Sequence, residues 1–202
     1  MDFFFSINYA VSEYVNPATG KIAAGGNFAA FNNNWLPQEK DIAALADAVT
    51  TQQAGLCAWH LVDGRRREGN TGAIKAGVII IDIDNQADGK DKDGNKIQKQ
   101  ELDVAQALEL DICDKYLSLA YLSPSHTETW PRFRLVFGLE KPIIDAGFYQ
   151  WFTRHIAQQI PGSDRRATQA VNLFYGGKGT SSLLVVTDRF IPAPKIDEAY
   201  AV

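Results

Sequence analysis

Two aspartates close the most hydrophobic run of the sequence. Asp82 and Asp84 end the segment AGVIIIDIDN, whose β-branched residues predict a buried strand over 76–84. Residues two apart on a strand face the same side, so the two carboxylates would point together, with Cα atoms roughly 7 Å apart. Two such charges repel each other and are costly to bury unless something compensates them. Mg²⁺ and Mn²⁺ prefer all-oxygen ligands of this kind, and a pair of such ions serves phosphoryl transfer.

Two simpler interpretations of this pair stay open. In the first, the strand ends at Asp82 and turns outward at Asp84 and Asn85, with no metal bound. In the second, the pair belongs to a metal-dependent nucleotide-sugar transferase. Such an enzyme needs an acceptor-binding half and a nucleotide-binding α/β domain, and 202 residues leave little room for both.

A second cluster combines hydroxyls, a histidine and arginines. It lies where the predicted strand 117–122 ends and the next predicted strand, 133–139, begins. In a hairpin these two positions face each other, and the result is a pocket rich in hydrogen-bond donors that suits nucleotide phosphates. A lone surface or core histidine is the plainer alternative. The residues are Ser123, Ser125, His126, Arg132 and Arg134.

A third acidic residue follows the predicted amphipathic helix 145–160. Asp164 stands before the strand-like segment NLFY and beside Arg165 and Arg166. An aspartate on a turn often pairs with a neighbouring arginine, and that interpretation needs no metal. As a third carboxylate ligand, however, Asp164 would complete a site with the pair at the end of strand 76–84.

The surrounding pattern indicates the elements that position these residues. From residue 76 the expected order is strand, helix, strand, strand, helix, strand, the split β-α-β pattern of an RNA-recognition-like or polymerase-palm sheet. The expected fold class is therefore α+β: an N-terminal α/β module packed on an RRM-like, palm-like β-α-β-β-α-β module, with the active site between them. The expected bounds are 1–75 and 76–190 for the modules and 191–202 for a tail or linker. The other expected elements are helices over 37–49 and 100–115, strands over 56–62, 172–175 and 182–187, and an exposed loop over 86–101.

Composition limits the class of partner. The chain has 20 basic and 24 acidic residues, a net charge of −4, whereas a protein that coats duplex DNA is usually basic. Any nucleic-acid contact must therefore be a local patch. The arginine candidates are Arg65, Arg66, Arg67, Arg165 and Arg166, the first three of which also fit a solvated loop. Trp35, Trp59 and Trp130 are candidates for base stacking or for the core.

Other sequence signals fit a cytoplasmic protein. Cys57 and Cys113 lie far apart without metal-ligand spacing, as expected of buried thiols in a reducing compartment. The N-terminal segment lacks the cationic start of a signal peptide. No run approaches the ~20 apolar residues of a membrane span, so no membrane partner is expected.

The three clusters, in this order, resemble the catalytic domain of the archaeo-eukaryotic primase (AEP) superfamily, particularly the primase-polymerases (PrimPols) of plasmids, phages and other mobile elements. The resemblance covers roughly residues 27–177 and rests on IDIDN, SPSHTETWPRFRLVF and the aspartate before NLFYGG. Two positions depart from the family pattern. Pro124 stands where the Ser-x-His motif has its serine, and Ser163 stands where a hydrophobic residue precedes the third aspartate.

This resemblance implies a DNA primase-polymerase. Asp82, Asp84 and Asp164 would hold two Mg²⁺ or Mn²⁺ ions, while His126, a serine hydroxyl and Arg134, with Arg132 beside it, would hold the β- and γ-phosphates. The implied reaction is template-directed nucleotidyl transfer from NTP or dNTP, which makes and extends primers on single-stranded DNA in replication. A replicative helicase, fused or separate, is the implied protein partner. A non-catalytic nucleic-acid-binding module is the alternative, and it would not need all three aspartates.

Overall fold

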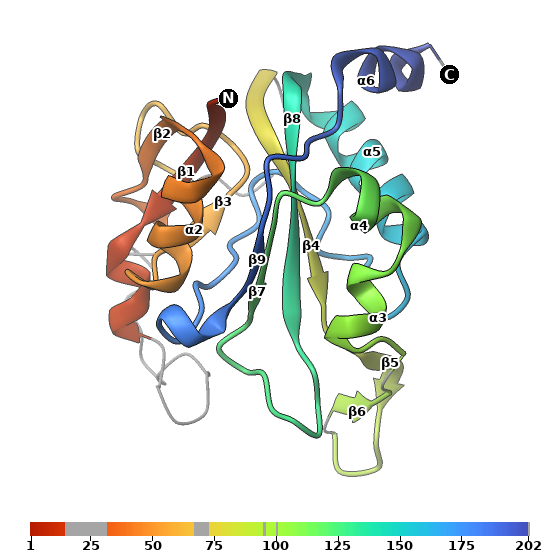
Figure 1. Ribbon diagram of the computed structural model, residues 1–202. Helices are drawn as coiled ribbons and strands as arrows, with labels where there is room; N and C mark the ends of the chain where they lie inside the picture. The colour runs from red at the N-terminus through yellow and green to blue at the C-terminus, as the bar shows by residue number, and fades with distance from the viewer. Residues whose placement is uncertain (15–31, 67–72, 95, 100, 202) are drawn as a thin grey trace.

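A four-stranded antiparallel sheet forms the centre of an α+β fold (Figure 1). The computed structural model describes residues 1–14, 32–66, 73–94, 96–99 and 101–201. The strand order is β4-β8-β7-β9, with bounds β4 (Ala73–Ile83), β8 (Phe133–Asp145), β7 (Leu119–Leu122) and β9 (Leu183–Val186). The expected strands at 76–84, 117–122, 133–139 and 182–187 are confirmed, and the third of them continues to Asp145.

Helices cover one side of this sheet, and the N-terminal part of the chain covers the other (Figure 1). The helical side carries α3 (Val104–Leu108), α4 (Asp111–Tyr116) and α5 (Ala146–Gln158). The other side carries α2 (Ile42–Thr50) and a small antiparallel sheet in the order β2-β1-β3, with β1 (Phe3–Asn8), β2 (Leu36–Lys40) and β3 (Gly55–Cys57). Short 3-10 turns lie at Tyr9–Tyr14 (η1) and Thr180–Ser182 (η2).

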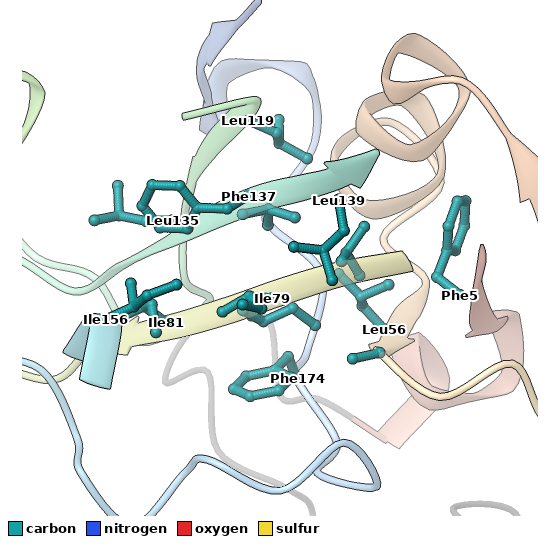
Figure 2. Close-up of a cluster of buried hydrophobic side chains, with 14 of the residues drawn as sticks. Phe5, Leu56, Ile79, Ile81, Leu119, Leu135, Phe137, Leu139, Ile156 and Phe174 are labelled. Atoms are coloured by element: carbon teal, nitrogen blue, oxygen red, sulfur yellow. The ribbon is translucent and has the colours of Figure 1, made fainter. Parts of the chain in front are cut away.

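The core lies where α5 packs on β4 and β8. Figure 2 shows Ile81 of β4, Leu135 of β8 and Ile156 of α5 in one buried cluster. The β-branched run therefore does bury its isoleucines, as the sequence predicts. This burial fixes the strand from which Asp82 projects.

Glycine permits the close approach of β1 to this sheet. A Cβ atom on Gly77 would lie 2.3 Å from the backbone nitrogen of Phe4, and one on Gly138 would lie 2.5 Å from the Phe3 ring. A larger residue at position 77 would therefore push β1 away from β4, and one at position 138 would displace the Phe3 ring. The N-terminal sheet thus packs directly on the main sheet, although the module boundaries after residues 75 and 190 stay predictions.

Several predicted elements differ from the structure. The helix expected over 37–49 begins only at Ile42, because Leu36–Lys40 pairs with β1 as strand β2 and Asp41 caps the helix by accepting from the Ala44 amide. The helix expected over 100–115 is two helices, because Leu110 is extended between them. The strand expected over 56–62 is only β3, which ends at Cys57.

Three more segments differ. The expected loop over 86–101 contains a hairpin of β5 (Gln86–Lys90) and β6 (Lys96–Gln98). The segment NLFY belongs to no strand of the main sheet, because Phe174 instead forms a bridge with Leu56. The Pro-containing tail includes a helix, α6 (Ala193–Tyr200), whose Ile196 is buried.

The last strand occupies an unexpected edge of the sheet. A ferredoxin-like order would place it beside the first strand of the module, but β9 pairs with β7. The edge of β4 is already covered, because Trp59 bridges Ala76 and Ser163 bridges Ile83. The segment after α5 therefore lies against the end of β4 before the chain reaches the opposite edge. None of the helices in the described part of the chain is long and apolar enough to span a membrane.

Candidate functional site

Each aspartate of the pair faces an arginine: Asp82 of β4 faces Arg134 of β8, and Asp84, just after β4, faces Arg132, just before β8. Asp82 is opposite Arg134 in the strand register, and Arg134 Nε lies 3.2 Å from Asp82 Oδ1. Arg132 Nη2 lies 2.7 Å from Asp84 Oδ1. Both contacts are close ion pairs, but Arg134 Nε and Arg132 Nη2 make no hydrogen bond of good geometry. The two predicted clusters thus meet at the paired strands.

The third aspartate is held beside the first by backbone hydrogen bonds. The Asp164 amide donates to the Asp82 carbonyl oxygen (2.8 Å), and the Asp84 amide donates to the Gly162 carbonyl oxygen (3.1 Å). Ser163, between them, bridges Ile83. Residues 162–164 therefore extend the sheet for a few residues at the carboxylate end of β4.

Gly162 is required at the start of this docked segment. Its φ angle of +71° lies in the left-handed region that favours glycine, and a Cβ atom there would lie 2.4 Å from Asn85 Oδ1. Its amide donates to Glu101 Oε2 at 2.9 Å. A larger residue would push the segment carrying Asp164 away from β4.

Asn85 fixes the chain just past the aspartate pair. It is fully buried at a positive φ of 46°, a conformation that asparagine tolerates better than most residues. Its side-chain amide donates to the carbonyls of Leu102 and Pro131 (2.7 and 2.8 Å). Its Oδ1 accepts from the amides of Glu101 and Leu102 (3.0 and 3.1 Å). The end of β4 is therefore tied both to the segment before α3 and to the segment before β8.

The hydroxyl and histidine cluster contacts the site through Arg132. Arg132 Nη1 donates to Ser125 Oγ (3.1 Å), and Ser125 Oγ lies 2.9 Å from Ser123 Oγ. The Arg132 amide donates to His126 Nδ1 (3.2 Å), so that nitrogen carries no proton. Burial lowers the pKa of His126 below its ordinary value, which favours the neutral imidazole with its proton on Nε2.

Arg134 is enclosed on the opposite side of the pair. It is buried, its Nη1 donates to the Tyr175 carbonyl oxygen (2.6 Å), and its guanidinium lies 5.7 Å from the ring centres of both Tyr121 and Phe174. Burial raises the pKa of Tyr121 to about 12. Arg134 is thus a fixed positive charge beside Asp82, whereas Arg132 lies nearer the hydroxyls.

The local charges balance one to one. Asp82 pairs with Arg134, Asp84 with Arg132, and Asp164 Oδ1 with Arg166 Nε at 3.2 Å. Burial raises the pKa of Asp82, Arg134 opposes this rise, and the charges of Asp84 and Asp164 add to it. The charges of Asp84 and Asp164 are therefore close enough to affect the ionisation of Asp82.

Two hollows meet at Asp164. A groove of about 910 Å³ is lined by Asp84, Asp164, Glu101 and Gln158, among others. A smaller hollow of about 320 Å³ is lined by Asp82, Arg134, Asp164 and Tyr175, among others. Asp164 is common to both and thus faces the space on either side of the aspartate pair.

The residues fit divalent cations by their chemistry. All three side chains offer carboxylate oxygens, the ligands that Mg²⁺ and Mn²⁺ prefer. The charges of Asp84 and Asp164 raise the pKa of Asp82, and the positive charges of Arg134 and Arg132 oppose this rise. Among the described residues, no three histidine, cysteine, aspartate or glutamate side chains are already arranged as metal ligands. Cations at this site would therefore replace arginine contacts.

The remaining predicted contacts divide into anchored and exposed residues. Arg66 donates to the Val171 carbonyl and Asn32 Oδ1 (3.2 and 3.0 Å), so it holds two segments together. Arg65 is exposed, and Arg67 lies outside the described residues. Arg165 and Arg166 are exposed and line the groove.

The predicted tryptophans are not exposed platforms. Trp35 is buried and Trp59 is half-buried. Trp130 donates its indole N–H to the carbonyls of Asp84 and Asn85 (2.9 and 3.0 Å), and Arg132 lies over its ring at 4.4 Å. Trp130 thus positions the end of β4.

The residues that assemble the site were not predicted in that role from the sequence. Asn85, Gly162, Trp130 and Tyr175 act through backbone and carbonyl contacts, which single-sequence patterns do not encode. A weak signal existed for two of them, because an asparagine directly after a strand and a Pro-Gly pair after a helix both favour turns.

Comparisons with known proteins assign no family. No family description and no curated protein matches the chain. Among solved structures, the chain is similar to the AEP domain of the cyanophage S-2L primase-polymerase (PrimPol), with a TM-score of 0.44 and 12% sequence identity over 98% of this chain and 88% of that one. Neither the TM-score nor the identity is high enough to assign the chain to the same family.

Proposed function

We propose that the protein is a primase-polymerase, a nucleotidyltransferase that makes and extends primers on single-stranded DNA. The observation that carries the proposal is the hydrogen bond from the Asp164 amide to the Asp82 carbonyl (2.8 Å), because it brings a distant third aspartate to the strand that bears the other two. The sequence motifs that resemble those of the AEP superfamily contain these same three positions. The Asp164 side chain also accepts from the amide and Nε of Arg166 (2.9 and 3.2 Å), as the metal-free turn interpretation predicts, so the Asp164→Asn variant decides between the two interpretations.

In this proposal Asp82, Asp84 and Asp164 hold the cations. Two divalent ions would supply charge neutralisation of the transferring phosphate and activation of the primer hydroxyl. The side chains of the protein bind and orient the nucleotide. Arg132 and Ser125 already contact each other, and His126 in its neutral form offers Nε2–H as a further donor for phosphate oxygens.

Charge balance predicts that cations and nucleotide bind together. Three aspartates and three arginines neutralise one another in pairs. A triphosphate alone would compete with the carboxylates for arginine, and a cation alone would compete with arginine for the carboxylates. When both bind, the arginine that leaves a carboxylate gains a phosphate, so neither charge is left unpaired.

The test is primer synthesis on a single-stranded template with labelled nucleotides and Mg²⁺ or Mn²⁺. We expect product from the native protein and none from Asp82→Asn, Asp84→Asn or Asp164→Asn. Asp111→Asn is the matched control, since Asp111 is exposed and pairs with Lys115 on its own helix (2.8 Å). A folded native protein that makes no product, or a fully active Asp164→Asn, would contradict the proposal.

One observation favours a second candidate, a non-catalytic nucleic-acid-binding module. Asp82 and Asp84 already have close arginine partners, so the site is electrically complete without metal. In that case the pairs would serve only stability. The three Asp→Asn variants would then bind DNA as the native protein does, and none of the proteins, native included, would transfer nucleotides.

A further inference from the structure

A row of aromatic rings runs along the outer face of α5. The Phe148 ring stacks on Tyr200 of α6, with centroids 3.4 Å apart and planes at 13°. Trp151 lies 5.5 Å from Phe148, and the His155 ring stacks on Trp151 at 5.7 Å and 11°. Trp151 and Tyr200 are 43% and 42% exposed, which is unusual for rings of this size. This aromatic row therefore presents flat surface to solvent.

The row leads directly into the groove. Trp151, His155 and Gln158 lie four and then three residues apart, so they share one face of the helix. Gln158 lines the groove that also contains Asp84 and Asp164. At 1.5 Å per residue, Trp151 is about 10 Å along the helix from Gln158, the length of roughly three nucleotides of a stacked strand. Figure 1 shows α5 along the side of the sheet, with α6 near the start of α5.

Positive charge gathers on this face between Trp151 and the groove, whereas the end of the face near Tyr200 carries Asp145, Asp197 and Glu198. Residues 146–166 contain three arginines, Arg154, Arg165 and Arg166, and a single acidic residue, Asp164, in a chain whose net charge is −4. All three arginines are exposed, and Arg154 is steadied by a hydrogen bond from its Nε to Thr168 Oγ1 (3.3 Å). The aromatic row is thus flanked by cations on its way to the groove.

We infer that this face binds single-stranded nucleic acid, with an unpaired base stacked on Trp151 and the strand continuing into the groove. Exposed aromatics beside a cationic track bind single strands without sequence preference, because every base has a π-face. A protein partner would also suit an exposed aromatic surface, but the arginines and the continuity with the groove favour a polyanion. The inference rests on the proposed function only in taking the groove as the route to the reactive centre.

The test measures the anisotropy of a fluorescein-labelled single-stranded oligothymidylate of about 16 nucleotides, a length within the site sizes of single-strand binders, in EDTA and without nucleotides. We expect Trp151→Ala to bind about 5- to 150-fold more weakly, the loss expected when one base–aromatic stack is removed. Trp151→Leu keeps apolar bulk without a ring and should bind as weakly as Trp151→Ala, whereas Trp151→Phe should retain most of the affinity. Tyr9→Ala is the matched control, since Tyr9 is 40% exposed in η1, which packs on β3 rather than on α5, and its loss should change nothing.

A second readout comes from tryptophan fluorescence. Trp151 is the most exposed of the four tryptophans, so oligothymidylate should quench the emission of the native protein and quench Trp151→Phe much less. Equal affinity of Trp151→Ala and the native protein, or no binding by the native protein, would overturn the inference. So would a native dimer that Trp151→Ala converts to a monomer, because the face would then be a protein interface.

The outcome separates this inference from the proposed function. The loss of affinity in Trp151→Ala is measured in EDTA and without nucleotides, so it does not depend on nucleotidyl transfer. If the native protein binds the oligothymidylate through Trp151 but transfers no nucleotides, the proposed function is contradicted and the inferred binding face is supported. If Trp151→Ala makes primers and binds the oligothymidylate as the native protein does, the proposed function is supported and the inferred binding face is contradicted.

Discussion

The amide of Asp164 donates a hydrogen bond to the carbonyl of Asp82 across 2.8 Å. The two residues are far apart in sequence, and the contact exists because α5 returns the chain to the end of β4. The third carboxylate of the candidate site is therefore placed by main-chain pairing rather than by side-chain contacts. Its position depends on the glycine that opens the docked segment and on the asparagine against which that glycine packs.

Gly162→Ala should misplace Asp164. Alanine would have to adopt the left-handed φ of +71°, and its Cβ atom would lie 2.4 Å from Asn85 Oδ1. We therefore expect the variant to lose ~2–4 kcal/mol of stability and most of its nucleotidyl transfer activity. Gly94→Ala is the matched control, because its φ is +81° but its Cβ would meet nothing. That variant should lose only ~1 kcal/mol and keep its activity. Urea unfolding and primer synthesis measure both effects, and equal behaviour of the two variants would contradict the explanation.

Asn85→Ala should destabilise the protein by ~2–4 kcal/mol. The substitution removes four hydrogen bonds of the Asn85 side chain and leaves the buried Leu102 amide and the carbonyls of Leu102 and Pro131 without that partner. Asn34→Ala is the control, since Asn34 also has a positive φ (63°) but is exposed. The urea midpoints of both variants measure the difference. A loss no larger for Asn85→Ala than for Asn34→Ala would show that the hydrogen bonds at the end of β4 contribute little.

Ser125→Ala should weaken nucleotide binding. It removes the oxygen that accepts from Arg132 Nη1 (3.1 Å), so the guanidinium loses one of the contacts that orient it. We expect a several-fold rise in the KM for nucleotide, as for the loss of one hydrogen bond of ~1 kcal/mol, with a smaller change in kcat. Ser181→Ala, at an exposed position, should leave both constants unchanged. An unchanged KM in Ser125→Ala would remove this serine from the phosphate pocket.

Acidification should destabilise the native protein through His126. Its folded-state pKa lies below the ordinary 6.5, because burial favours the neutral ring. The stability that neutral His126 contributes is therefore complete above pH 6.5 and is lost as the pH falls from there through the lowered folded-state pKa. His126→Gln lacks this titration and keeps His60 and His155. The fall in urea midpoint between pH 7.5 and 5 should be smaller for His126→Gln than for the native protein, and parallel curves would contradict the assignment.

The sequence predicts the strand and the helix beside the candidate residues better than the contacts that bring those residues together. The β-branched run before Asp82 indicates a buried strand, because a strand that is buried on both faces has apolar residues at nearly every position. The helix α5 follows from the 3.6-residue spacing of its buried residues. The pairing of Asp164 with β4 could not be predicted in this way, because it depends on the positive φ of Gly162 and on long-range main-chain bonds. The edge position of β9 could not be predicted either, since it results from other segments covering β4. Trp151 was missed because a helical aromatic is expected to face the core.

The most direct test of the central claim is Mn²⁺ binding in the presence of a nucleoside triphosphate, measured by the electron paramagnetic resonance signal of free Mn²⁺. We expect the native protein and Asp111→Asn to bind the ion equally, and Asp82→Asn, Asp84→Asn and Asp164→Asn each to bind it at least tenfold more weakly, the ~1.4 kcal/mol or more that a lost carboxylate ligand should cost. Asp164→Asn that binds Mn²⁺ as tightly as the native protein would contradict the claim that the three aspartates share one site.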